Sequence, residues 1–221
     1  MRIVVGSLIV LLAAVAPASA QTKAEVSGFF GWTLADGVSG DPVLGGDGNI
    51  YDRVDPADSE SFGFSLATVF GQHVEVGFLW DRQSTTLEIG GTTTRDMGEL
   101  DITNMHGYVG YNFGSTDSPV RPYVLGGLGA TSYSNVAFTT AGGAALETGG
   151  NTQFSTTWGA GVKLFPSAGA FGIRAGVRWT PTFIKSDADG WWCDPYWGCY
   201  VVGDTQYANQ LEFHGGITLR F

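Results

Sequence analysis

Charged side chains alternate with apolar or small residues in several segments of this chain. Carboxylates, cations and an imidazole on one shared face could neutralise one another as ion pairs, or could line a path for ions or protons. A buried charge without a partner is costly, so enclosed residues of this kind should pair. The members of this set are Glu25, Glu75, Lys163, Arg174, Arg178, Glu212, His214 and Arg220.

The last segment of the chain shows which element must position these side chains. From Leu211 to Phe221, the odd positions carry Leu, Phe, Gly, Ile, Leu and Phe, whereas the even positions carry Glu, His, Gly, Thr and Arg. A period of two residues predicts a β-strand with two faces of opposite character. Because lipid cannot solvate the charged face, this strand fits a closed transmembrane barrel, with apolar residues outside and polar residues inside.

Eight segments of this kind can be traced along the chain. Their approximate ranges are 24–34, 61–70, 73–80, 101–113, 122–133, 153–165, 171–183 and a closing strand that ends at residue 221. Segments of this length suit tilted membrane strands. The predicted fold is an all-β, eight-stranded, antiparallel, up-and-down transmembrane β-barrel, which we expect to be a monomer.

The connections between these segments alternate in length. The short connections are 71–72, 114–121 and 166–170, and the long ones are 35–60, 82–100, 134–152 and 184–206. Outer-membrane barrels have short periplasmic turns and longer extracellular loops, so both chain ends are expected on the periplasmic side.

Aromatic residues cluster at the predicted strand ends. The group near the short turns is Phe70, Phe113, Tyr123, Phe171 and Phe221, and the group near the long loops is Trp32, Phe62, Trp80, Trp179 and Tyr207. Two such girdles are expected where a barrel meets the two membrane interfaces.

The N-terminus has the features of a secretory signal peptide. Arg2 precedes a mostly apolar run over 3–15, and Ala18-Ser19-Ala20 forms an Ala-x-Ala cleavage site. The apolar run is shorter than the roughly 20 residues that a spanning helix needs. We therefore expect a cleaved signal peptide over 1–20 and a barrel over 21–221.

The charge balance argues against some partners. The chain has 11 Lys+Arg against 21 Asp+Glu, a formal net charge of −10. Such an acidic surface disfavours nucleic acid and anionic membrane surfaces. No nucleic-acid partner and no cofactor are expected.

The Ala18-Ser19-Ala20 signal end, the eight alternating segments, the Arg121-Pro122-Tyr123-Val124 start of the fifth segment and the terminal Phe221 together resemble one known group. The chain is similar to the small bacterial outer-membrane β-barrel family, which includes the barrels of outer membrane proteins A, X and W. The resemblance implies the outer membrane of a Gram-negative-type bacterium, with lipid and lipopolysaccharide as surroundings. It also implies a terminal signal for the barrel assembly machinery, matched by Phe213, Ile217, Leu219 and Phe221, although Gly215 departs from the pattern.

The interior of an eight-stranded barrel is just wide enough for side chains to fill it. On this ground a plug of paired charges is favoured over a gated ion path. Arg178 and Glu212 lie equally far from the last loop on the two strands that it connects. They are therefore expected to lie opposite one another and to form a pair. Across the seam that closes the barrel, Glu25 is expected beside Arg220.

The last long connection contains two cysteines and the densest aromatic cluster of the chain. Cys193 and Cys199 lie in an exported chain, where oxidation is permitted, and no nearby ligands have metal-site spacing. A loop disulfide is therefore favoured. The aromatic residues are Trp191, Trp192, Tyr196, Trp197 and Tyr200. They suggest a partner surface, or they fold over the barrel mouth or rest among lipid headgroups.

Other readings have less support. Asp47-Gly48-Asn49-Ile50-Tyr51-Asp52 in the acidic first connection hints at calcium, but it lacks a closing Glu, so a solvated loop is favoured. A soluble ligand-binding barrel would have to enclose several tryptophans. No His-x-Ser arrangement supports a lipid A-modifying enzyme.

The expected role is structural or surface-presenting, without catalysis or metal. A narrow channel or passive transporter for small solutes is the alternative, and a lipid A-modifying enzyme comes third.

The disulfide can be tested directly. Mass spectrometry of the unreduced protein is expected to find Cys193 linked to Cys199. Because the closed loop is short, chain-closure entropy should contribute only about 2–3 kcal/mol, and the barrel should survive reduction. Free thiols in the purified, oxidised protein would contradict the linkage.

Overall fold

The computed structural model describes residues 23–44, 48–139, 145–147, 150–166, 169–184, 193–194, 198–199 and 206–221. The predicted signal peptide over 1–20 lies outside these residues. Within the described part, no helix is long and apolar enough to cross a membrane.

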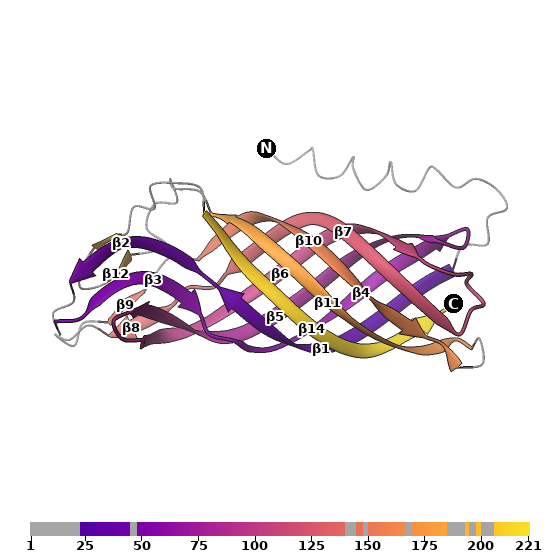
Figure 1. The fold of residues 1–221 in the computed structure, drawn as a ribbon, viewed down its shortest axis with the longest axis horizontal. Helices are drawn as coiled ribbons and strands as arrows, with labels where there is room; N and C mark the ends of the chain where they lie inside the picture. The colour runs from indigo at the N-terminus through magenta and orange to yellow at the C-terminus, as the bar shows by residue number, and fades with distance from the viewer. Residues whose placement is uncertain are drawn as a thin grey trace.

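Eight long strands form a closed barrel (Figure 1). They are β1 (Lys23–Asp36), β4 (Ser59–Phe70), β5 (Val74–Gly91), β6 (Arg95–Asn112), β7 (Val120–Tyr133), β10 (Asn151–Leu164), β11 (Phe171–Ile184) and β14 (Gln206–Arg220). Each strand pairs antiparallel with the next in the chain, and β14 pairs back with β1. This confirms the predicted fold class.

Side chains alternate between the two faces of the wall, as the period of two requires. On β1, Val26, Phe30 and Trp32 are exposed on the outside, whereas Glu25 and Thr33 are buried inside. The two ends of the barrel differ in their connections. Turns between β4 and β5 and between β6 and β7 contain Gly71 and Gly114, whose positive φ angles of 62° and 96° favour glycine.

Two of the predicted long loops are instead largely strands. The 35–60 connection contains β2 (Val38–Leu44) and β3 (Ile50–Pro56), and β3 pairs with the distal part of β5. The 82–100 connection does not exist as a loop, because β5 and β6 continue as a hairpin to residues 91 and 95. In Figure 1, these strands extend the barrel at the end opposite the C-terminus.

The sequence did not predict these additional strand segments, because their outward face is polar. Leu87 and Leu100 still point inward and are buried, but Ser84 and Glu99 face outward. Alternation between polar and apolar residues therefore persists without an apolar outer face. Short hairpins also occur in the last two long connections, as β8 (Ala137–Thr139) with β9 (Ala145–Glu147) and β12 (Cys193–Asp194) with β13 (Gly198–Cys199).

An apolar cluster fills the interior of the extension. We call it the upper apolar cluster; its buried members are Val38, Leu87, Leu100, Ile102, Tyr133, Val136, Ile184 and Ala208. Burial of this apolar surface stabilises the strands that continue beyond the membrane-spanning part.

The prediction that Tyr123 belongs to an aromatic girdle is wrong. Tyr123 is only 4% exposed and points into the barrel. The Arg121-Pro122-Tyr123-Val124 alternation places Val124 outside and Arg121 inside. The glycine-rich β7 had left this facing ambiguous, since glycines mark neither face.

The orientation of the barrel can be tested with inserted epitope tags. A tag at Thr93, between β5 and β6, is expected to be detected on intact cells, whereas a tag at Asp117, between β6 and β7, is not. Successive turns of an up-and-down barrel lie at opposite ends, and the short turns are periplasmic. Both tags should be detected after permeabilisation; surface labelling at Asp117 would reverse the orientation.

Candidate functional site

The barrel interior contains the charged residues that the alternation indicated, and they lie at three levels. At the first level, nearest the barrel end that contains the C-terminus, Lys163 Nζ lies 2.5 Å from Glu25 Oε2 and 2.5 Å from Glu75 Oε2. Arg121 Nη1 donates to Glu25 Oε1 at 2.9 Å. Tyr108 donates its hydroxyl proton to Glu75 Oε1 at 2.7 Å. These contacts join strands from opposite sides of the barrel.

The middle level is built around Arg174, which bonds to neutral groups. Its Nη1 donates to Ser65 Oγ at 3.1 Å, and its Nη2 donates to the Tyr123 hydroxyl at 3.0 Å. The guanidinium also lies over the Tyr123 and Phe29 rings, at 5.1 and 5.8 Å from their centroids. His214 stacks at a tilt against Phe29, with 5.3 Å between ring centroids.

The third level contains the expected pair of Arg178 and Glu212. These residues are opposite one another on β11 and β14, and Arg178 Nη2 contacts Glu212 Oε2. The same Nη2 lies 2.8 Å from Asp81 Oδ1, and Asn104 donates to Asp81 Oδ2 at 2.9 Å. One cation is therefore shared by two carboxylates.

The seam contains a different arrangement from the expected one. Glu25 and Arg220 are opposite one another on β1 and β14, as predicted. However, Glu25 makes ion pairs with Arg121 and Lys163. Arg220 donates to the carbonyl oxygens of Thr116 and Gly169 and lies 4.3 Å from the Phe165 ring centroid. Arg220 occupies the barrel end, so its long side chain reaches the turns.

The sequence reading missed two charged members of this interior. Asp81 was missed because the third predicted segment stopped at Trp80, and Arg121 because the facing of β7 was ambiguous. Asp81 could have been found by extending the alternation by one inward position beyond Leu79, and Arg121 by assigning Pro122 and Val124 to the outside.

A histidine and a serine also meet inside the barrel. His106 Nε2 lies 2.9 Å from Ser155 Oγ, and Thr131 donates to the same oxygen at 2.9 Å. A serine and a histidine in contact are the core of many nucleophilic sites. Here both are almost fully buried on the inward face, and His106 Nδ1 has no hydrogen-bond partner among the described residues. The pair is therefore enclosed and faces away from lipid.

The acidic first connection uses its carboxylates to bind the backbone. Asp55 Oδ1 accepts from Gly37 N at 3.1 Å, and Asp58 Oδ1 accepts from Ala35 N at 3.0 Å. Burial raises the pKa of the Asp55 carboxyl above its usual value. No cluster of three or more His, Cys, Asp or Glu residues suited to a metal occurs in the described ranges, and Asp47 lies outside them.

The predicted aromatic cluster and the two cysteines lie in the last long connection, 184–206. Trp191, Trp192, Tyr196, Trp197 and Tyr200 are outside the described residues. The backbone of β12 and β13 places Cys193 directly opposite Cys199. Opposite residues of an antiparallel pair have Cα atoms about 4.5–5.5 Å apart, which suits a disulfide; the linkage remains a prediction.

The expected assembly signal lies on the outside of the closing strand. Phe213, Ile217 and Leu219 are exposed on β14, and Phe221 follows at 74% exposure. Recognition of these residues during assembly also stays a prediction.

The comparisons with known proteins agree with this architecture. The family described as the outer membrane protein beta-barrel domain matches residues 5–221. The chain belongs to this family. It is accordingly an outer-membrane β-barrel protein. No curated protein matches the sequence significantly.

Solved structures show the same fold as this family member at low sequence identity. OprG from Pseudomonas aeruginosa is 13% identical with a TM-score of 0.57, and the match covers 91% of this chain and 97% of OprG. Neisserial surface protein A is 13% identical with a TM-score of 0.50, covering 90% and 97% of the two chains. AlkL, solved in lipid bilayers, is 14% identical with a TM-score of 0.50, covering 94% of each.

Removal of the buried cation Lys163 should cost stability. Lys163→Met leaves Glu75 buried without its cation, so unfolding free energy is expected to fall by about 3–5 kcal/mol. The measurement is urea unfolding in lipid vesicles, followed by tryptophan fluorescence.

The matched control is Lys23→Met, which removes a lysine from the partly exposed pair with Asp117. Exposed pairs contribute about 0–1 kcal/mol. Equal losses in the two variants would contradict a stabilising role for the buried network.

Proposed function

We propose that this protein is a non-conducting outer-membrane barrel that presents its extracellular strands and loops as a structural or binding surface. The observation that carries this proposal is the filled interior. Buried side chains occupy the membrane-spanning part at three levels, and the upper apolar cluster lies beyond them.

The chemistry of this interior argues against a passive route for ions. Conduction requires sites that an ion can enter and leave. In this barrel the carboxylates of Glu25, Glu75 and Glu212 are engaged by Lys163, Arg121 or Arg178. The apolar cluster adds a layer that cannot replace the water around an ion. These features support a closed lumen over the channel alternative.

The outer end of the barrel is suited to presentation. β5 and β6 extend well past Trp80 and Met105, and β3 adds to the side of β5. Their outward faces are polar, so they are compatible with water.

We further infer a monomer in the outer membrane of a Gram-negative-type bacterium, in contact with lipopolysaccharide and inserted by the barrel assembly machinery. Catalysis does not enter this proposal, since the His106–Ser155 contact is enclosed.

Single-channel recording in planar bilayers tests the closed lumen. The native protein is expected to give no steady conductance. Glu212→Ala removes a side chain from the interior and leaves Arg178 with Asp81 alone, so its leak should exceed that of the native protein. Glu88→Gln, on the outward face of β5, is the matched control and should behave as native.

Protein insertion is verified separately by quantifying reconstituted protein in vesicles from the same preparation. A large, steady native conductance would overturn the closed lumen and favour the narrow channel or transporter.

A further inference from the structure

We infer that a hollow on the lipid-facing surface of the barrel binds one acyl chain of an outer-leaflet lipid. The hollow has a volume of about 630 Å³, within the range of small-ligand sites. We call it the wall groove. The inference rests on the proposed orientation of the barrel, but it does not depend on a closed lumen. The outward-facing lining residues are Val76 on β5, Gly107 and Val109 on β6, Gly126 and Leu128 on β7, and Trp158 on β10.

Two outward-facing glycines form the floor of the wall groove. Val109 is opposite Gly126, and Gly126 is opposite Trp158, so large side chains stand on both sides of this glycine. A Cβ added at Gly107 would meet nothing within 4 Å. Leu128 and Val109 are 63% and 56% exposed, so they project from the wall. The backbone at the two glycines is therefore recessed between projecting apolar side chains.

The wall groove offers no free polar side-chain group to a ligand. None of its lining side chains is charged. Trp158 Nε1 already donates to Thr156 Oγ1 at 3.2 Å, and Tyr108, whose backbone borders the groove, donates its hydroxyl proton to Glu75 inside the barrel. A ligand with hydrogen-bonding groups would lose its solvation here without compensation. The complementary occupant is an uncharged, apolar chain.

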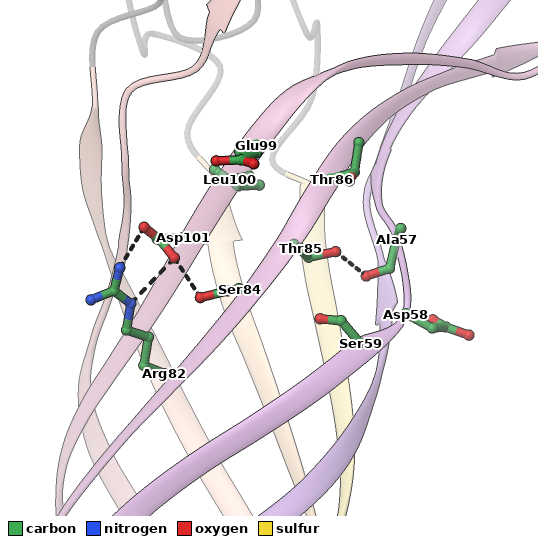
Figure 2. Close-up of a pocket in the computed structure, with 10 residues that line it drawn as sticks. All are labelled: Ala57, Asp58, Ser59, Arg82, Ser84, Thr85, Thr86, Glu99, Leu100 and Asp101. Atoms are coloured by element: carbon green, nitrogen blue, oxygen red, sulfur yellow. Dashed lines mark hydrogen bonds and ion pairs between the residues drawn. The ribbon is translucent and has the colours of Figure 1, made fainter.

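The wall groove lies near the middle of the apolar band. Figure 2 shows Arg82 paired with Asp101 at the extracellular end of this band, where the outward face becomes polar. Arg82 is opposite Thr103, and Gly107 follows Thr103 by four residues and precedes Phe113 of the other girdle by six. An outer-membrane barrel meets hydrocarbon at this depth. The groove is thus continuous with the surface that contacts lipid.

A single thin chain fits the wall groove better than a second barrel does. Nine residues line the groove, whereas a stable protein interface takes about 20–30 residues a side. Lipid chains are as apolar as the wall, so association within the membrane depends on packing. A hollow that stays empty forfeits van der Waals contacts. A flexible acyl chain can enter and restore them, whereas the convex wall of another barrel cannot.

Small residues continue the wall groove toward the extracellular end. On β6 and β7, successive outward rows contain Gly126, then Gly107, then Ala130, which is one small residue in each row. The next row toward the periplasm has Tyr111 opposite Val124, and both are 44% exposed. A chain therefore reaches the groove from the extracellular side. Since the lipid of that leaflet in the proposed outer membrane is lipopolysaccharide, the assigned occupant is one of its acyl chains.

Quenching of Trp158 fluorescence by brominated acyl chains measures occupancy of the wall groove. The full chain, with phenylalanine at its other six tryptophan positions, is reconstituted in vesicles of phospholipid that is brominated near the chain ends. Gly107→Leu fills the groove with a side chain, so quenching of Trp158 should fall about twofold. Gly28→Leu is the matched control on β1 and should leave quenching unchanged, because this exposed glycine lies outside the groove.

Both variants should fold as the native protein does, because a Cβ added at Gly107 or Gly28 meets nothing within 4 Å. Circular dichroism of the same vesicles verifies folding. Equal quenching in the native protein and both variants, or an equal loss in the two variants, would overturn the chain site.

Photocrosslinking in cells identifies the source of the chain. A benzophenone amino acid at Leu128 is expected to form an adduct with lipopolysaccharide, which Gly107→Leu should reduce about threefold and Gly28→Leu should not reduce. A predominant phospholipid adduct would overturn the outer-leaflet source, and an adduct with a second copy of the chain would overturn the lipid. A steady native conductance would reject the closed lumen and leave these outcomes unaffected.

Discussion

The pairing of β14 with β1 is the constraint on which the rest of this structure depends. At membrane depth, every backbone N–H and C=O group must find a partner within the protein, because lipid offers none. The antiparallel register from Glu25 and Arg220 to Asp36 and Asn209 removes the last free edge among the eight barrel strands. Once the sheet is closed, each strand has one face toward lipid and one toward a narrow interior. The contrast between the two faces follows from that closure.

Closure also sets the chemistry of the interior. Long charged side chains that point inward leave water and must satisfy one another. Lys163 does so with two glutamates, and Arg178 does so with Asp81 and Glu212. Arg174 instead uses hydroxyl groups and aromatic faces. The same enclosure that makes these contacts strong makes the removal of one partner expensive.

Beyond the membrane the same strands meet a different solvent, and their faces change accordingly. The outward positions of β5 become polar after Trp80, while Leu87 and Ile89 fill the interior. The extension thus resembles a soluble β-structure, with apolar residues inside and polar residues outside, whereas the membrane-spanning part has the reverse arrangement. Polar groups gather on the outer face at this transition, because the solvent changes along continuous strands.

The sequence by itself determined the eight strands, the facing of all of them except β7, and most of the inward charges, because the period of two is a local property of the backbone. Strand neighbours along the chain also allowed Arg178 to be placed opposite Glu212. Only the tertiary structure decided the partners of Lys163, which lie on β1 and β5 across the interior. Such contacts depend on how the strands tilt and stagger around the closed barrel, and no local pattern contains that information. The polar extensions and the facing of Tyr123 were likewise decided by pairing with neighbouring strands.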